Sequence, residues 1–351
     1  MSLPEYVTEV RENHRLDEAR LKAYLDGRLP QLGSELSLHQ FKGGQSNPTY
    51  LLTSGDSQWV LRKKPRGKLL PSAHLVEREF RVIQALSDTA VPVPHAHFLC
   101  EDPEVIGTAF YVMDYVPGRI FHAPHLPDAP QAQRAAMYDS MAETLAALHA
   151  VDYAAVGLED FGKPSGYIAR QIKRWSSQYT ASATDEVASM QSLMRWLPDN
   201  IPQGEQTTIA HGDFRPGNLL FHPEEPRVIA VLDWELATLG HPLGDLGYFC
   251  LAYHLPNMSK ELGGLVGMDL KEMNVPDEAS FVASYCNYAG RPVPESLNFF
   301  VGFSLFRLAA ILQGVYQRSL QGNASDPKAG MYGMAATMLA DLAWQTVGGG
   351  S

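Results

Sequence analysis

A short polar stretch in the second half of the chain carries the residues best suited to chemistry. It reads HGDFRPGN from His211 to Asn218, so Asp213 and Asn218 are five positions apart. The strand-like run VIAVLDWE then brings Asp233 fifteen residues after Asn218. A hydroxyl nucleophile needs a carboxylate to accept its proton, and Mg²⁺ binds carboxylate and amide oxygens. These side chains could cap turns, but the triple between two apolar runs favours a metal-assisted transfer to a hydroxyl group.

A second candidate pair lies in the first third of the chain. The spacing predicts a helix over 72–88, and Glu79 falls within the same narrow sector as its apolar residues. A carboxylate on an apolar face is costly unless a cation pairs with it. The preceding run WVLRKK offers Arg62 and Lys63, which strand alternation places on opposite faces. Only one of these two cations can therefore reach Glu79.

The elements that must position these residues change in character along the chain. The first part has strand-like runs at 49–53 and 58–62, joined by the hairpin signal Ser-Gly-Asp-Ser, and a further run at 109–118. Helical patterns then cover 131–150, 168–179, 186–197, 278–289 and 297–318, interrupted by a hairpin at 218–221 and 228–234. We expect an α+β, bilobal fold. A lobe with a small antiparallel sheet and a helix spans 1–113, a hinge spans 114–118, and a larger, mainly helical lobe spans 119–351.

Composition excludes several classes of partner. The 351 residues carry 28 Lys and Arg against 39 Asp and Glu, and this net charge of −11 argues against nucleic acid or an anionic membrane as a partner. The three cysteines show no metal-ligand spacing, which is typical of free thiols in a reducing compartment. The most apolar stretch, 299–316, has Arg307 in its middle, which favours a buried helix over a membrane span. We expect a cytoplasmic protein.

The motifs resemble those of a known family. HGDFRPGNLLF together with VLDWE is similar to the catalytic and metal-binding loops of the aminoglycoside phosphotransferase family, which has the protein-kinase-like fold. The resemblance implies an ATP-dependent enzyme with Asp213 as the catalytic base and with Asn218 and Asp233 as Mg²⁺ ligands. It also implies that His211 supports the loop. Asp245 would brace the loop backbone, although a simple helix N-cap is the other interpretation of Asp245.

The same resemblance implies a nucleotide site in the first third of the chain. FKGGQSNPTY lies where the family has the loop that covers the ATP phosphates, although it is not GxGxxG and a plain hairpin turn is the other interpretation. YVMDYVPG resembles the hinge that contacts the adenine. The family pairs the helix glutamate with a strand lysine, and the position that aligns best here carries Arg62, a departure that favours Arg62 over Lys63 as the partner of Glu79. The implied nucleotide site consists of Gly43, Gly44, Ser46, Asn47, Arg62, Glu79, the Asp114 carbonyl and the Val116 N–H.

The length of one loop restricts the class of molecule that could accept the phosphate. Only 12 residues separate Asp233 from Asp245, too few for the peptide platform of a protein kinase, so we expect a small molecule with a hydroxyl group. Glu235 and Arg307 are candidates for the pocket wall. An acidic pocket would favour an aminoglycoside or a choline-like cation, and converging arginines would favour an anion.

Two longer strings narrow the resemblance further. VLRKKPRGKLLPSAHLVEREFRV and LDWELATLGHPLGDLGY look especially like kinase-like modules associated with acyl-CoA dehydrogenases, which suggests a hydroxyacyl-CoA or another hydroxylated acid as acceptor. An alternative from a different class is a nucleotide-binding regulatory module without turnover, a pseudokinase. The replaced lysine and the unusual glycine loop motivate that alternative.

Overall fold

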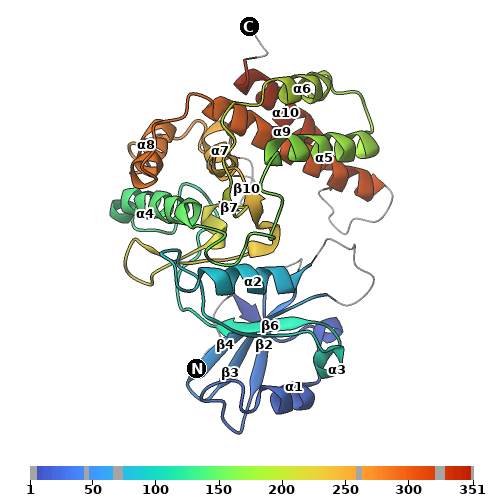
Figure 1. Ribbon diagram of the computed structural model, residues 1–351, viewed down its shortest axis with the longest axis vertical. Coiled ribbons are helices and arrows are strands. Elements are labelled where there is room, and N and C mark those ends of the chain that lie inside the picture. Colours follow the sequence, from blue (N-terminus) through green and yellow to red (C-terminus); the bar gives the residue numbers. More distant parts are fainter. Residues whose placement is uncertain (1–5, 43–46, 66–73, 258–262, 321–328, 349–351) are drawn as a thin grey trace. The chain divides into compact units, whose positions relative to one another are not determined.

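The chain divides into two compact units. The computed structural model describes residues 6–42, 47–65, 74–257, 263–320 and 329–348 (Figure 1). Unit 1 comprises Met1–Arg119 and Ile229–Ala237, and unit 2 comprises Ile120–Val228 and Thr238–Ser351. The segment 229–237, which the sequence assigned to the helical lobe, thus groups with the sheet-containing unit. One contact that holds it there is the Val231 N–H, which donates to the Pro92 carbonyl at 2.8 Å.

Unit 1 is built on an antiparallel sheet of six strands in the order β1-β2-β3-β4-β6-β5 (Figure 1). The strands are β1 (Val7–Thr8), β2 (Ser37–Phe41), β3 (Thr49–Ser54), β4 (Ser57–Lys63), β5 (Ala96–Cys100) and β6 (Phe110–Asp114). Strands β3, β4 and β6 correspond to the three predicted runs. Register places Arg62 of β4 opposite Thr49 of β3 on one side and Tyr111 of β6 on the other.

The helices of unit 1 cover the two faces of this sheet. They are α1 (Glu18–Leu25), α2 (Val76–Leu86) and α3 (Pro103–Ile106), with the 3₁₀ turns η1 (Glu12–His14) and η3 (Trp234–Leu236). Trp59 and Leu61 of β4 pack in one apolar cluster with Leu21 and Leu25 of α1. Because side chains alternate along a strand, Arg62 projects from the opposite face. Helix α2 begins at Val76, four residues later than predicted, and contacts β5, β6 and η3.

Unit 2 is mainly helical, as predicted. Its helices are α4 (Gln131–Ala150), α5 (Tyr167–Ser182), α6 (Ala188–Asp199), α7 (Pro242–His254), α8 (Glu278–Tyr288), α9 (Leu297–Leu320) and α10 (Ala329–Thr346). Strands β7 (Thr208–Ala210) and β10 (Thr238–Gly240) form a short antiparallel pair. Asn218 lies in the 3₁₀ turn η2 (Pro216–Asn218), directly before strand β8 (Leu219–Phe221). Strand β9 (Val228–Val231) leads into the segment that groups with unit 1, and β8 and β9 are the two strands of the predicted second hairpin.

Helix α9 is the central packing element of unit 2, in contact with α5, α7 and α10 (Figure 1). Gly247 allows α7 to approach it closely, since a Cβ there would lie 2.7 Å from the Phe300 backbone. By length and composition α9 could cross a membrane, but 67% of its most apolar window is buried inside the protein. The prediction of a buried helix is confirmed. The antiparallel sheet followed by a helical unit confirms the predicted protein-kinase-like α+β fold.

Candidate active site

Arg62 is the centre of an ionic cluster in unit 1, which we call the Arg62 cluster (Arg62, Glu79, Asp233). Its Nε lies 2.7 Å from Glu79 Oε2, and its Nη2 lies 2.5 Å from Asp233 Oδ1. Glu235, the predicted pocket residue, lies at the edge of the cluster with Oε2 3.9 Å from Arg62 Nη2. Lys63 projects from the other face, where its Nζ donates to the Lys64 carbonyl at 2.9 Å. The cation that pairs with Glu79 is therefore Arg62.

Glu79 is almost fully buried and all its partners are donors. The side chain is 1% exposed. Asn47 Nδ2 donates to Oε1 at 2.7 Å, and the Tyr111 hydroxyl donates to Oε2 at 3.1 Å. Burial raises the pKa of Glu79, and the Arg62 guanidinium counters that rise. Burial opposes the charge of Arg62, but Glu79, Tyr111 and Asp233 outweigh it and raise the pKa of Arg62, so this cation stays protonated.

Asp233 is held by an unusual local backbone. Its φ is +62°, in the left-handed region that Asp tolerates better than most residues, and it immediately precedes η3. The next residue, Trp234, is 2% exposed, and its Nε1 donates to the Val231 carbonyl at 3.0 Å. This buried indole anchors the turn and thereby aims the Asp233 carboxylate at Arg62. Strained positions of this kind concentrate at functional sites.

The predicted catalytic loop, residues 211–218, lies in unit 2 and is called here the Asp213 loop. The Tyr248 hydroxyl donates to Asp213 Oδ1 at 2.6 Å, and Asn218 Nδ2 donates to Oδ2 at 2.7 Å. Asn218 Nδ2 also reaches the Asp213 carbonyl at 2.9 Å, which closes the turn at η2. Arg215 Nε lies 3.3 Å from Oδ1 on the more exposed side. Both oxygens of Asp213 are thus oriented by donors.

Asp245 of α7 braces the backbone of this loop. It accepts the His211 N–H at 2.6 Å and the Gly212 N–H at 2.9 Å. Burial alone would raise the pKa of Asp245, but His149, His211 and the Gly212 N–H lower it. The helix-cap interpretation of Asp245 is wrong, because the N-cap of α7 is His241, whose ring accepts the Leu243 N–H at 3.2 Å.

His211 supports the Asp213 loop from within. It is fully buried, and its Nδ1 accepts the Asp213 N–H at 3.2 Å. Arg307, the other predicted pocket residue, reaches the loop from α9, where its Nη2 donates to the Gly212 carbonyl at 3.0 Å. The structure thus brings Asp213, Asn218, His211, Asp245 and Arg307 together in unit 2.

The other residues predicted to bind the nucleotide lie in different surroundings. Gly43, Gly44 and Ser46 lie outside the described residues. The amide of Asn47 serves Glu79, so the structure gives that side chain a place in the Arg62 cluster. At the predicted hinge, His97 Nε2 lies 2.7 Å from Asp114 Oδ1. In the described part of the chain, the Val116 N–H makes no backbone hydrogen bond.

Sequence reasoning did not single out Tyr111 and Tyr248, the two tyrosines that contact the site carboxylates. For Tyr248 a signal existed, because it follows Asp245 by three positions on one helix and residues at that spacing share a face. Burial and Asp213 raise the pKa of Tyr248, so its hydroxyl stays a donor. Tyr111 gave no local signal, since its approach to Glu79 depends on strand register.

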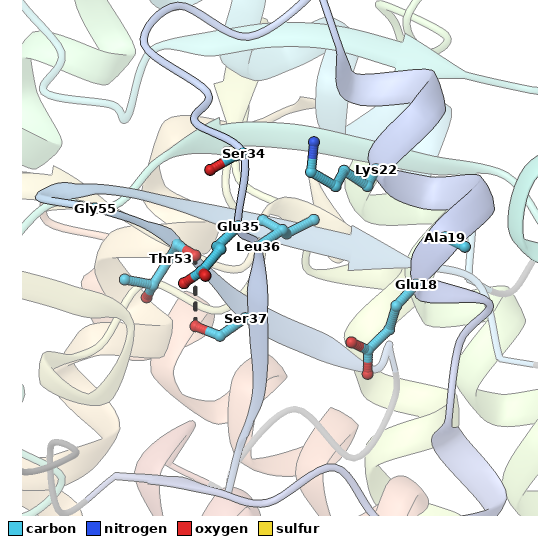
Figure 2. A pocket seen from close by; sticks show the side chains of 9 residues that line it. All are labelled: Glu18, Ala19, Lys22, Ser34, Glu35, Leu36, Ser37, Thr53 and Gly55. Atoms are coloured by element: carbon cyan, nitrogen blue, oxygen red, sulfur yellow. Dashed lines mark hydrogen bonds between the residues drawn. The ribbon is translucent and has the colours of Figure 1, made fainter.

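A cavity of about 550 Å³ lies elsewhere in unit 1, against α1, β2 and β3. Figure 2 shows its lining, which consists of Glu18, Ala19, Lys22, Ser34, Glu35, Leu36, Ser37, Thr53 and Gly55. It includes none of the predicted site residues.

The fold and the Asp213 loop together define a kinase-like phosphotransferase. The chain belongs to the phosphotransferase enzyme family, whose model matches residues 37–281. It is 46% identical over 336 residues to acyl-CoA dehydrogenase family member 10 of Mus musculus, covering 95% of this chain and 31% of that protein. The resemblance to aminoglycoside phosphotransferases and to modules of acyl-CoA dehydrogenase relatives is confirmed. The chain spans less than half the length of the curated relatives it matches.

Solved structures support the same family. A protein of Ralstonia eutropha JMP134, provisionally assigned as an aminoglycoside phosphotransferase, is 45% identical with a TM-score of 0.87, covering 95% of this chain and 98% of that one. Aminoglycoside phosphotransferase APH(4)-Ia, solved with ADP and hygromycin B, is 17% identical with a TM-score of 0.62, covering 94% and 99%. At that identity the second likeness shows the fold alone.

Proposed function

We propose that the chain is an ATP- and Mg²⁺-dependent phosphotransferase that moves the γ-phosphate to a hydroxyl group of a small molecule. Family membership supports a small-molecule kinase in general. The observation that carries the proposal is the Asp213 carboxylate, oriented at both oxygens by Tyr248 and Asn218 in a loop whose backbone Asp245 braces. A carboxylate held in this way is suited to accept a proton from an incoming hydroxyl group.

In the proposed reaction the acceptor hydroxyl gives its proton to the Asp213 carboxylate. A lone pair of the acceptor oxygen forms the new O–P bond to the γ-phosphorus while the bond from that phosphorus to the β–γ bridging oxygen breaks. ADP then leaves with the electron pair of the broken bond. Tyr248 and Asn218 keep Asp213 in one orientation throughout, so that little reorganisation is needed during the transfer.

The nucleotide would be held by unit 1. Arg62 is a permanent cation and presents a planar fork suited to phosphate oxygens, and Glu79 holds that fork in place. The phosphates would be covered by the loop that carries Gly43, Gly44, Ser46 and Asn47. The adenine would contact the Asp114 carbonyl and the Val116 N–H. The complex of APH(4)-Ia with ADP, a protein of the same fold, supports nucleotide use.

The donor set fits Mg²⁺. Asn218 uses its Nδ2 on Asp213, which leaves the amide oxygen as a donor to a cation. Arg62 engages Oδ1 of Asp233, and within the described residues Asp233 Oδ2 has no hydrogen bond. Amide and carboxylate oxygens are the ligands that Mg²⁺ prefers, and we propose that Asn218 and Asp233 hold it. When bound, Mg²⁺ would neutralise charge on the transferring phosphate.

We further propose a hydroxyacyl-CoA or another hydroxylated metabolite as the acceptor. The support is the 46% identity to a protein named for the acyl-CoA dehydrogenase family. We propose a cytoplasmic protein whose partner is this small molecule and not nucleic acid or a membrane, consistent with the net charge of −11.

The test is a coupled assay of ADP release with ATP and Mg²⁺ across hydroxyacyl-CoAs, amino sugars and amino alcohols. We expect turnover with at least one class and a loss of about 10²–10⁴-fold in kcat for Asp213→Asn, the range that general-base catalysis supplies. ADP affinity measured by calorimetry should be unchanged in this variant. Near-normal turnover of Asp213→Asn would contradict the role of Asp213.

A second candidate is a regulatory module that binds nucleotide without turnover. Its specific support is Arg62, which replaces the family's lysine and lies 2.5 Å from Asp233 Oδ1. The intact set of Asp213, Asn218 and Asp233 favours the enzyme. Binding of ATP with no phosphoryl transfer to any acceptor in the panel would favour the module.

A further inference from the structure

Arg307 of α9 contacts the Asp213 loop. Its Nη2 donates to the Gly212 carbonyl, one residue before Asp213, at 3.0 Å. The Tyr248 ring, whose hydroxyl contacts Asp213, has its centroid 5.4 Å from Arg307 Cζ. Arg307 and Asp213 therefore share two neighbours, a backbone carbonyl and an aromatic side chain. An acceptor hydroxyl that gives its proton to Asp213 therefore lies near Arg307.

The guanidinium of Arg307 is fixed in place by two aromatic rings. Its Cζ lies 5.7 Å from the Trp175 ring centroid of α5, in addition to the contact with Tyr248. Contacts of this kind attract the cation to the ring faces and restrict its plane. Trp175 itself is tethered, because its Nε1 donates to Gln171 Oε1 at 3.0 Å. Arg307 is thus held ready as a rigid donor group.

Most of the donors of this group are unused. Within the described residues, Arg307 Nε is buried and has no hydrogen-bond partner, and Nη1 has none either. Buried donors without a partner are rare in native proteins, and each calls for an explanation. An oxygen acceptor supplied by a ligand is a direct explanation, since a guanidinium binds carboxylate or carbonyl oxygens through its parallel N–H groups.

The charges of this region are predominantly positive. Tyr248 lies in the field of Arg307 and Arg215 as well as Asp213. Tyr167 lies in the field of Arg307, Arg174 and Arg170. The carboxylate that also acts on Tyr167, Asp245, is committed to two backbone N–H groups. The arginines therefore favour an oxygen-rich acyl group over an amino sugar or a choline-like cation as the neighbour of Arg307.

We infer that Arg307 determines specificity for the acceptor by binding its acyl oxygen. This inference rests on the proposed function, including its hydroxylated acyl acceptor, and adds the residue that recognises the acyl group. The hydroxyl group is presented to Asp213 and the acyl oxygen to the unused N–H groups of Arg307. The oxygen is a carboxylate oxygen in a free acid and a carbonyl oxygen in a thioester, and both accept from a guanidinium.

The experiment compares matched acceptors on three variants. The acceptors are short hydroxy acids with the hydroxyl at different carbons, their CoA thioesters, and alcohols of equal length without the acyl group. The variants are Arg307→Ala, Arg307→Lys and, as a control on the same helix, Arg318→Ala, which alters an exposed arginine. Acceptor binding is measured by calorimetry in the presence of ADP, and turnover by ADP release.

We expect Arg307→Ala to weaken binding and raise KM for the acyl acceptors by about tenfold or more, as for loss of a charge-assisted hydrogen bond. Arg307→Lys should fall between, because it keeps the charge but loses the fork. The plain alcohols should lose less turnover than the acyl acceptors, because with them Arg307→Ala removes only contacts within the protein, such as the one with the Gly212 carbonyl. The affinity for ADP should not change, and Arg318→Ala should match the wild type. A larger response with free acids than with thioesters would identify the carboxylate as the source of the oxygen, and the reverse would identify the thioester.

Two results would overturn the inference. One is a preference of the wild type for amino sugars or choline-like acceptors. The other is an equal loss with acyl and plain alcohols in Arg307→Ala and Arg307→Lys, which would show a purely structural role. Absence of turnover with every acceptor would instead contradict the proposed function, while the binding measurements still decide the role of Arg307.

Discussion

The Arg62 cluster in unit 1 and the Asp213 loop in unit 2 hold their carboxylates by opposite means. Glu79 is buried and paired with a permanent cation at 2.7 Å. Asp213 is 21% exposed and is oriented chiefly by neutral donors, the Tyr248 hydroxyl and the Asn218 amide, with Arg215 on its more exposed side. A carboxylate that only positions a cation can be locked in an ion pair. One that must take up a proton is better oriented by neutral groups.

The two regions also differ in what sets their geometry. In unit 1 strand register places Arg62 between Thr49 and Tyr111. In unit 2 the helix α7 does this work, because it carries both Asp245, which holds the loop backbone, and Tyr248, which holds the Asp213 side chain. We therefore expect the stability of unit 1 to depend most on its buried ion pair. The geometry of the Asp213 loop in unit 2 should depend on individual hydrogen bonds.

The largest expected effect is on the buried ion pair. Arg62→Met should lower the free energy of unfolding by about 3–5 kcal/mol, because it leaves Glu79 buried without its cation. The measurement is urea denaturation at neutral pH. Lys64→Met is the matched control. Its partner Glu77 is 31% exposed, and loss of such a pair costs about 1 kcal/mol or less. Equal losses in the two variants would refute the buried-charge account.

The next largest effect is a pH dependence of the free energy of unfolding, caused by His241 at the start of α7. Burial lowers the pKa of His241 from 6.5 to about 4, so the unfolded chain binds a proton more readily than the folded one. The stability contributed by neutral His241 is fully present above pH 6.5 and is lost as the pH falls towards 4. The loss amounts to about 3 kcal/mol.

The check is urea denaturation between pH 7 and 4 on the wild type and His241→Asn. The Asn side chain can still accept the Leu243 N–H as an N-cap but does not titrate. The two proteins should therefore diverge at low pH, with the variant falling less steeply. Parallel curves would show that His241 is not the titrating group.

A smaller effect is expected at the brace of the loop. Asp245→Asn leaves one oxygen to serve the His211 and Gly212 N–H groups and should cost about 2 kcal/mol, as for a hydrogen bond to a charged group. It should also lower kcat, since the Asp213 loop loses support. Asp277→Asn, at the N-cap of α8, is the control and should be near neutral because both residues cap well. If Asp245→Asn changed neither the free energy of unfolding nor kcat, the contacts of Asp245 with the loop backbone would contribute little.

The smallest effect tests orientation alone. Tyr248→Phe removes the hydroxyl that donates to Asp213 Oδ1 and should lower kcat by about tenfold, with KM for ATP unchanged. Tyr253→Phe removes a hydroxyl on the same helix that donates to the Pro276 carbonyl, away from Asp213, and should leave kcat unchanged. If both variants behave alike, the neutral-donor account of Asp213 is wrong.

Part of the fold was predictable because it depends on local pattern. Strands β3 and β4 and helix α4 lie where hairpin signals and helical spacing predicted them. No pattern in the sequence predicted α1 or α10. Helix α1 has only eight residues, and α10 is rich in Ala, Met and Gly and lacks a clear polar face. Periodicity cannot reveal a helix whose pattern is too short or too uniform.

The sequence alone determined which residue types were available and how they were spaced. The motif of Asp213 and Asn218, and the carboxylate of Glu79 on an apolar face, follow from spacing along one segment. The tertiary structure alone decided that Arg62 rather than Lys63 meets Glu79, that Asp233 closes on Arg62, and that Asp245 serves the loop while His241 caps α7. The reason is that periodicity follows from local chain geometry, whereas these contacts join segments up to 171 positions apart and depend on register and packing.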